Sequence, residues 1–343
     1  MEPYSPMFTI TPEILNFAYE IAADLERIDI IREKALTPQL RKENRIKTIH
    51  SSLWIEANSL TLEQVTDIVN GKRVSGPKKD ILEVKNAIVA YDELLECNPY
   101  NEKDLLKQHD LLMNRLITDA GKYRNKSVGV FDGDVPIHIA PPHHSVPFLI
   151  NQLLDWTKNT RLPQVVKSCI FHYEFEYIHP FSDGNGRMGR MWQTLLLYQE
   201  NPVFAWLPLE SIIAHNQQEY YRALRRSTHH NDSGIFAQFM LSAIKKVTAE
   251  FKEKNQNYEL ENAGVNASAN AGVKLSKTQE KILTIIAKDS SISQSEIAKK
   301  IKINESTVYR NIEKLKELKI LERQGADKTG AWIIKKQKMK GKR

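Results

Sequence analysis

The chain has 343 residues with a formal net charge of +7, and 41% of them are hydrophobic, which is enough for two or three domains with a substantial core. It contains no apolar run as long as a membrane span, no N-terminal basic segment followed by an apolar run, and only two cysteines, without a zinc-binding spacing. These features exclude an integral membrane protein and a disulfide-stabilised secreted domain, and we expect a cytoplasmic protein.

Two amphipathic helices are predicted at the start of the chain, each beginning at a Thr-Pro pair. Thr11-Pro12 begins a helix that extends to about residue 36, and Thr37-Pro38 begins one that extends towards Ile55. Near the end of the second helix Ser52 and Glu56 are four residues apart, so they lie on the same face. Taken alone, Glu56 is better explained as a solvated helix residue than as a functional one.

A break at Asn58-Ser59 separates this helix from the next, which Thr61 and Gln64 begin with the spacing of a capping box. Two further helices are predicted over residues 81–95 and 105–117, because apolar residues recur there at helical spacing. We expect their charged residues to lie on solvent faces.

A β-hairpin is predicted next. Five β-branched residues alternate on both sides of Asp132-Gly133-Asp134, and Pro141-Pro142 ends the pattern. They are Val128, Val130, Val135, Ile137 and Ile139. A purely structural hairpin explains this pattern as well as a functional one.

The strongest chemical signal lies in residues 179–190, which read HPFSDGNGRMGR between two apolar helical patterns. Gly184 and Gly186 allow a sharp loop and a close ligand approach. The first amides of the following helix have no internal partner, and the helix dipole favours negative charge there. The segment therefore predicts an anion site suited to phosphate.

Four side chains around this loop extend the prediction to a reaction. Arg187 and Arg190, three residues apart, suit more than one phosphate group. Asp183 offers a hard oxygen ligand for Mg²⁺. His179 is the natural general base for a hydroxyl nucleophile. Each residue alone has an ordinary structural explanation, such as a cap or a solvated face, and it is their conjunction that predicts transfer chemistry.

The segment resembles the signature of the Fic family, His-x-Phe-x-(Asp/Glu)-Gly-Asn-Gly-Arg-x-x-Arg, at every fixed position. The resemblance implies a helical core that binds ATP with Mg²⁺, or with Mn²⁺ in its place, and transfers AMP to a protein hydroxyl. The related Doc kinases carry Lys where this chain has Gly186, so Gly186 favours transfer of AMP over transfer of phosphate.

Carried over by position, the resemblance makes His179 the catalytic base and Asp183 the metal ligand. Phe181 becomes a buried anchor under the loop, and Arg190 binds the γ-phosphate. The implied nucleotide-binding residues of the loop and helix are Asp183, Gly184, Asn185, Gly186, Arg187, Met188, Gly189 and Arg190.

Three other segments resemble family elements. Residues 52–58 are similar to an inhibitory motif, (Ser/Thr)-x-x-x-Glu-(Gly/Asn), in which Ser52 and Glu56 occupy the key positions and Glu56 pairs with Arg190. Ala57 departs from that pattern.

The hairpin is similar to the flap over the nucleotide, with Val130, Phe131, Asp132 and Gly133 as contacts. Tyr220 of a helix over residues 212–224 is similar to a pocket residue, although an aromatic pair on a helix is also typical of a core.

The last part of the chain is basic: residues 274–343 contain 19 Lys and Arg against 8 Asp and Glu, whereas the rest contains 30 against 34. Three short helical patterns and a hairpin there resemble a winged helix-turn-helix. The resemblance places Ser306, Thr307, Tyr309 and Arg310 against DNA. A protein partner or a homodimer is the alternative, because the charge of this segment is modest.

The predicted fold class is an all-α Fic-like core with a short β-hairpin flap, plus a small C-terminal winged helix domain of α+β type. The predicted boundaries are 1–110 for an N-terminal helical region with the inhibitory helix, 111–250 for the catalytic domain, 251–274 for a linker, 275–335 for the winged helix and 336–343 for a basic tail.

The leading hypothesis is a self-inhibited protein adenylyltransferase that uses ATP to modify Ser, Thr or Tyr hydroxyls of target proteins and of itself. The alternatives are a DNA-binding transcriptional regulator whose core senses a nucleotide, and an enzyme that removes AMP from modified proteins with Glu56 orienting water.

Overall fold

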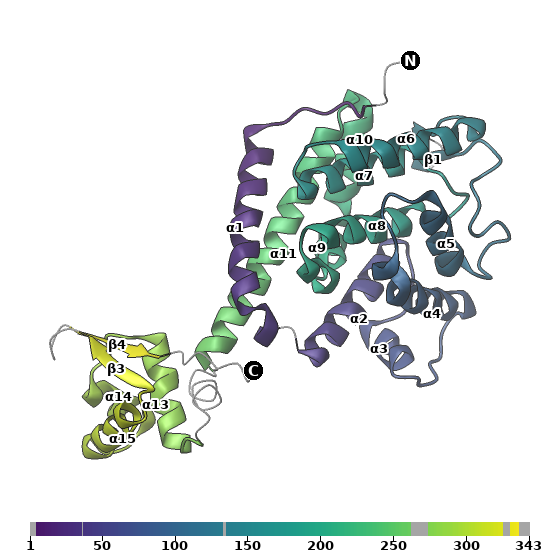
Figure 1. Ribbon diagram of the computed structural model, residues 1–343. Helices are drawn as coiled ribbons and strands as arrows, with labels where there is room; N and C mark the ends of the chain where they lie inside the picture. The colour runs from purple at the N-terminus through teal and green to yellow at the C-terminus, as the bar shows by residue number, and fades with distance from the viewer. Residues whose placement is uncertain (1–4, 36, 133–134, 262–273, 325–329, 336–343) are drawn as a thin grey trace, which may run out of the picture. The chain divides into compact units, whose positions relative to one another are not determined.

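The computed structural model of the chain describes residues 5–35, 37–132, 135–261, 274–324 and 330–335 (Figure 1). The chain separates into two compact units, Met1–Phe251 and Lys252–Arg343. Among the described residues, no helix is long and apolar enough to cross a membrane.

Helices make up most of the first unit. Their bounds are α1 (Pro12–Ala35), α2 (Pro38–Ile55), α3 (Leu62–Val69), α4 (Lys78–Glu93), α5 (Glu102–Met113), α6 (Val146–Asn159), α7 (Gln164–Ile178), α8 (Asn185–Glu200), α9 (Leu209–His215), α10 (Gln217–His230) and α11 (Ser233–Glu261). Short 3-10 turns lie at Leu94–Glu96, His143–Ser145 and Pro202–Trp206.

The predicted helix starts are confirmed by their caps. The Thr37 hydroxyl accepts a hydrogen bond from the backbone N–H of Leu40 at the start of α2. Thr61 and Gln64 form the expected capping box of α3. Such caps satisfy amide groups that have no partner within the helix, which fixes where each helix begins.

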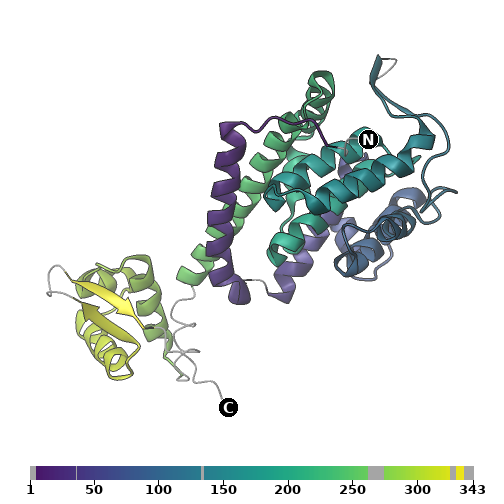
Figure 2. The same ribbon diagram turned by 45° about the horizontal axis from the view of Figure 1, so that its top comes forward.

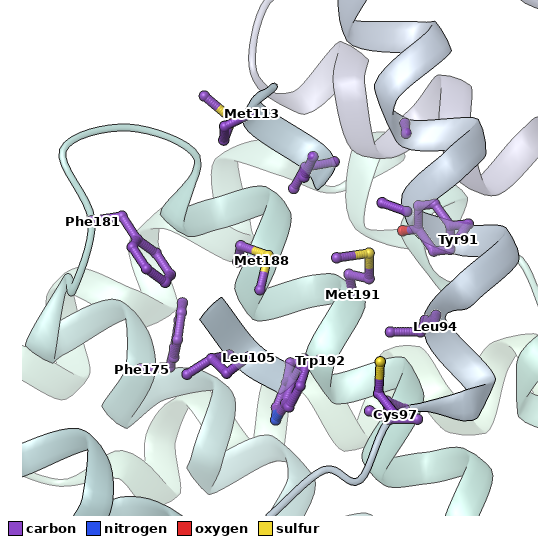
Figure 3. Packing of buried hydrophobic residues seen from close by; sticks show 14 of the residues in the cluster. Tyr91, Leu94, Cys97, Leu105, Met113, Phe175, Phe181, Met188, Met191 and Trp192 are labelled. Atoms are coloured by element: carbon purple, nitrogen blue, oxygen red, sulfur yellow. The ribbon is translucent and has the colours of Figure 1, made fainter. Parts of the chain in front are cut away.

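The helix pair α7 and α8 forms the centre of the unit, and both helices are buried over most of their length. Figure 3 shows Phe181, from the loop between them, beside Phe175 of α7 and near Met188 of α8. The Phe181 side chain is completely buried, with its ring centroid 6.1 Å from that of Phe175. Phe181 therefore fixes the loop to the core, as expected.

A second apolar cluster joins the N-terminal helix to the end of the unit. Buried side chains of α1, among them Ile14 and Ile21, belong to the same cluster as Phe236 and Ile244 of α11. Accordingly α1 runs alongside α11 in both views (Figures 1 and 2). These helices also help to enclose α7 and α10, which contribute Tyr173 and Tyr220 to the same cluster.

The predicted hairpin forms from β1 (Gly129–Asp132) and β2 (Val135–Ile139), which pair in antiparallel orientation with Gly129 opposite Ile139. The register shifts between Val130 and Phe131. Strand β2 lies near α10. The turn at residues 133–134 lies outside the described residues.

Two helical segments differ from the sequence prediction. The helix expected over residues 212–224 is divided into α9 and α10 at Asn216, whose φ and ψ of −120° and 32° are not helical. In addition, α11 continues to Glu261, through residues expected to be linker. The extension is rich in Lys, Glu and Gln, which have good helix propensity even without an apolar pattern.

The second unit contains α13 (Lys277–Lys288), α14 (Gln294–Ile301), α15 (Glu305–Glu317) and an antiparallel pair of strands, β3 (Leu321–Gln324) and β4 (Ala331–Ile334). Ser293 and Glu296 form the predicted capping box of α14. Trp332 of β4 is buried and donates a hydrogen bond to the Ile292 carbonyl, which ties the hairpin to the helices. The three helices and hairpin form their own apolar core.

Candidate active site

The loop between α7 and α8 has a backbone that few residues adopt. His179, the C-terminal cap of α7, lies in the left-handed region with φ 50°, and Gly184, the N-terminal cap of α8, has φ 85°. A positive φ is strained for a residue other than glycine and is common at functional sites. The Asn185 side chain bonds both the N–H and the carbonyl of Phe181, at 2.9 Å each. These bonds hold the loop in one shape.

Gly186 matters for a different reason from the one expected. It lies inside α8 without a positive φ, so conformational freedom is not what it supplies. A Cβ atom at this position would lie 2.3 Å from Oε1 of Glu56 and 3.1 Å from Nη1 of Arg190. The glycine therefore leaves the space in which these two charged groups meet.

A cavity of about 250 Å³ opens beside this turn of α8. Its walls come from the end of α2, from α7, α8 and α10. The lining residues are Glu56, Tyr173, Glu176, Tyr177, His179, Gly186, Arg190, Tyr220, Tyr221, Leu224, Arg225 and Thr228. Five of them, Glu56, His179, Gly186, Arg190 and Tyr220, are residues that the sequence analysis selected.

Arg190 is the charged centre of the cavity, and its side chain is only 1% exposed. It donates to Oε1 of Glu56 at 2.8 Å, to the Ser52 hydroxyl at 3.2 Å and to the Ser52 carbonyl at 2.9 Å. Its Nη1 has no hydrogen-bond partner among the described residues. Burial lowers the pKa of Arg190, but the combined effect of Glu56, Tyr220 and Glu176 outweighs burial, so the pKa is raised above its usual value. Arg190 is therefore a buried cation with one donor unused in the described part of the chain.

Arg187 lies between two carboxylates on the other side of the turn. Its Nη2 is 3.0 Å from Oδ1 of Asp183, and its Nη1 is 3.1 Å from Oε1 of Glu83. The Asp183 side chain is 48% exposed and also accepts a hydrogen bond from the N–H of Gly184. Glu83 was expected on a solvent face of its helix but is 6% exposed. That expectation was wrong because helical spacing does not show where a buried arginine needs a partner.

His179 reaches the cavity from a backbone that neighbouring groups hold in place. The Arg124 Nε donates to the His179 carbonyl at 2.7 Å, and Arg124 also donates to the carbonyls of Lys126 and Pro141 at the two sides of the hairpin base. Arg124 is 3% exposed. One buried guanidinium thus joins the hairpin to the end of α7.

His109 of α5 supports the loop from the core and was not predicted. It is fully buried and stacks on Phe181 with 3.6 Å between ring centroids. Its Nδ1 accepts from the N–H of Gly121, so its Nε2 carries the proton and donates to the Asp183 carbonyl at 3.0 Å. Burial lowers the pKa of His109 to about 4, which keeps the ring neutral.

Glu176 is a further unpredicted member of the cavity wall. Its side chain is 13% exposed, and its Oε1 has no hydrogen-bond partner among the described residues. Burial raises the pKa of Glu176 to about 8. Its nearest basic neighbour, His172 Nε2, lies 3.8 Å away, and burial lowers the pKa of that histidine to about 3. Burial therefore favours the neutral form of this carboxyl group in the cavity wall.

The remaining predicted residues lie in the cavity wall, in the contact between α7 and α8, and in the hairpin. Tyr220 is 1% exposed and packs in the cavity wall, with its hydroxyl 3.1 Å from Nε2 of His172. Met188 points into the apolar core, and Gly189 faces His172 and Glu176 of α7. Val130, Phe131 and Asp132 form β1, but their side chains and Gly133 lie outside the described residues.

Comparisons with known proteins identify both units. Residues 99–197 match the Fic/DOC family, and residues 275–322 match a family described as winged helix-turn-helix DNA-binding. The solved structure of a Fic family protein from Desulfovibrio desulfuricans G20 is 38% identical, with 99% of this chain and 100% of that chain covered and a TM-score of 0.70. The chain belongs to the Fic family. The expected fold class, a helical Fic core with a hairpin and a C-terminal winged helix, is confirmed.

Two other relatives are similar to this chain over shorter segments. The protein adenylyltransferase Fic of Nematostella vectensis is 27% identical over 259 residues, which are 69% of this chain and 57% of that protein. A probable protein adenylyltransferase of Aquifex aeolicus is 40% identical over 88 residues, a quarter of each chain. The chain thus spans 57% or less of the length of these Fic relatives.

Proposed function

We propose that this Fic protein is an adenylyltransferase that transfers AMP from ATP to a hydroxyl group of a protein, and that Glu56 inhibits it. The observation that carries the proposal is Arg190, a buried cation that faces the cavity next to Gly186 and His179. A buried arginine beside a helix N-terminus is suited to a phosphate group. Its relatives from Nematostella vectensis and Aquifex aeolicus, a protein adenylyltransferase and a probable one, support the same reaction.

In the proposed reaction His179 takes the proton from a Ser, Thr or Tyr hydroxyl, and the hydroxyl oxygen attacks the α-phosphorus of ATP. A new P–O bond forms, the bond between the α-phosphorus and the bridging oxygen breaks, and pyrophosphate leaves. The amides at the start of α8, with Arg187, stabilise the negative charge that develops. Tyr220 and its aromatic neighbours in the cavity offer an apolar wall for the nucleoside.

A divalent cation fits the residues present. No group of three or more metal-binding side chains occurs among the described residues. Mg²⁺ commonly uses one or two carboxylates together with substrate phosphates and water. Asp183, half exposed at the mouth of the loop, would be that carboxylate. When bound, the cation would neutralise phosphate charge, and Mn²⁺ has the same oxygen preference.

Inhibition follows from the position of Glu56. Its carboxylate bonds the guanidinium nitrogen Nη2 of Arg190 and occupies the space left by Gly186. A terminal phosphate would need that same donor and that same space. We infer that ATP binds productively only after Glu56 moves away, and that the chain with Glu56 in place has low activity.

The test is incorporation of AMP from labelled ATP in a lysate, followed by identification of the modified peptides. Glu56→Gly should increase incorporation, and the same chain with His179→Ala should lose it. Unchanged labelling in both variants would refute the proposal. Release of AMP from a modified target, lost in Glu56→Ala, would assign the reverse activity instead.

The second unit suggests a DNA contact in addition. Ser306, Tyr309 and Arg310 lie exposed on one side of α15, the helix that follows the turn in this class of domain. We propose that this face binds duplex DNA. Binding that weakens steeply with salt and is lost in Arg310→Ala would support it, whereas a protein partner or a homodimer would give binding without DNA.

A further inference from the structure

Glu83 of α4 is a buried carboxylate to which the reaction described above assigns no role. It is 6% exposed, and each of its oxygens has a partner from a different segment. Oε1 is 3.1 Å from Nη1 of Arg187, and Oε2 accepts from Nδ2 of Asn58 at 2.7 Å. The Nζ of Lys79 lies 3.9 Å from Oε1 of Glu83, but Lys79 is largely exposed, so this ion pair adds little to the stability of the folded chain.

The two carboxylates beside Arg187 differ in their freedom to move. The Glu83 side chain is 7% exposed and is also bonded to Asn58, whereas the Asp183 side chain is 48% exposed at the loop surface. An exposed carboxylate can turn to a cation at small cost, but a buried one cannot. When Asp183 binds a cation, Glu83 is therefore the carboxylate that still neutralises Arg187.

The second partner of Glu83 belongs to the inhibitory segment. Asn58 lies two residues after Glu56, and its Oδ1 accepts from the N–H of Leu60. Its Nδ2 also reaches the Asp80 carbonyl at 3.2 Å, and the Asp80 carboxylate bonds the N–H and hydroxyl of Ser59. The first turn of α4 thus anchors the chain directly after Glu56.

We propose that Glu83 is a positioning residue that serves both states of the site. It holds Arg187 towards the phosphates while Asp183 binds the cation, and through Asn58 it keeps the segment after Glu56 in its inhibitory place. The inference deepens the proposed function and rests on it. One buried carboxylate then links nucleotide binding to release of inhibition.

Two substitutions separate these roles. Glu83→Gln keeps the shape and an acceptor for Asn58, but places an amide near the Arg187 guanidinium and removes the charge. Asp183 is then the only carboxylate left beside Arg187, and Arg187 must compete with the cation for it. Asn58→Ala is the matched variant, because it removes the bond to the inhibitory segment and leaves Glu83 beside Arg187.

The first measurement is ATP affinity by calorimetry over a range of Mg²⁺ concentrations, in chains of residues 1–343 that carry Glu56→Gly and His179→Ala. Adding Glu83→Gln should weaken ATP binding roughly ten-fold or more and shift the Mg²⁺ dependence to higher concentration. Adding Asn58→Ala should change neither. In the active Glu56→Gly chain, Glu83→Gln should raise KM for ATP more than it lowers kcat.

The second measurement is hydrogen exchange of the backbone amides of residues 58–60 in chains that retain Glu56. Asn58→Ala should speed their exchange most, and Glu83→Gln, which keeps only a neutral acceptor for Asn58, should speed it less. Glu83→Asp provides a charged variant if the Gln variant does not fold. A lower Tm with unchanged ATP affinity and unchanged Mg²⁺ dependence in Glu83→Gln would make Glu83 merely structural. If the Glu56→Gly chain itself binds no ATP, the proposed function fails first.

Discussion

Removing the Glu56 carboxylate should destabilise the chain without nucleotide and increase the stabilisation that nucleotide gives. In Glu56→Ala, Arg190 keeps its bonds to the Ser52 hydroxyl and carbonyl but loses its carboxylate partner at 2.8 Å. In the parent chain the Arg190 side chain is only 1% exposed. A cation in that position is poorly solvated and poorly neutralised.

The size of the effect follows from the exposure of the two partners. Breaking a fully buried pair costs about 3–5 kcal/mol. The Glu56 side chain is 32% exposed, so water already weakens this pair. We therefore expect a loss of about 1–3 kcal/mol, and each kcal/mol corresponds to about 2–4 °C in Tm for a unit of this size.

The assay is thermal unfolding of Glu56→Ala, Glu56→Gln and the parent chain, each with and without ATP and Mg²⁺. Saturating ligand at about one hundred times its Kd stabilises a protein by about 2.7 kcal/mol. Glu56→Ala should show the lowest Tm alone and the largest gain with ATP, and Glu56→Gln, which keeps an acceptor, should lie between. A Glu56→Ala chain that gains no more from ATP than the parent would refute the reasoning.

Two further predictions concern buried groups outside the signature. Burial raises the pKa of Glu176 from 4.5 in the unfolded chain to about 8 in the folded chain. The free energy of unfolding therefore keeps its full Glu176 contribution below pH 4.5 and loses it as the pH rises from 4.5 to about 8. Stability should fall by about 1.4 kcal/mol per pH unit in that window, and unfolding of Glu176→Gln should show a weaker fall. His109→Phe keeps the stacking but leaves the Gly121 N–H and the Asp183 carbonyl unpaired, so denaturant unfolding should show a loss of about 2–4 kcal/mol.

The sequence predicted the loop between α7 and α8 and the start of α8 because these residues are close in the chain. Gly184 caps the start of α8, and this fixes the backbone positions of Arg187 and Arg190 in the first two turns of that helix. The contact of Glu56 with Arg190, 134 residues apart, was expected only from the family resemblance. Physical arguments from Glu56 alone favoured a solvated helix residue.

The missed residues share a physical cause. Glu83, His109 and Glu176 all lie within regular helical patterns, where a polar residue is normally expected on the solvent side. Each is instead buried or nearly so, because a distant backbone group, an arginine or the cavity decides its surroundings. Their partners are found only after α4, α5 and α7 have packed against α8, so spacing within one helix could not identify them.

The last prediction comes from the position where the chain departs from the family pattern. Ala57 follows the end of α2 and has φ 63°, in the left-handed region. Its N–H bonds the Trp54 carbonyl, and the N–H of Asn58 bonds the Leu53 carbonyl, which together form the Schellman pattern that normally ends on glycine. An alanine there is strained by about 1–2 kcal/mol.

Ala57→Gly should therefore stabilise the helix end that holds Glu56. The relief is partly offset by about 0.4–1 kcal/mol of added freedom in the unfolded chain, so the net gain should be about 0.5–1 kcal/mol in denaturant unfolding. Ala57→Val is the opposite control, since a β-branched residue is disfavoured at positive φ. Because the strain acts on the inhibitory segment, Ala57→Gly should also lower AMP incorporation when Glu56 is present and leave it unchanged in Glu56→Gly. Equal labelling of the parent chain and the Ala57→Gly variant, both with Glu56 present, would show that the strain does not weaken inhibition.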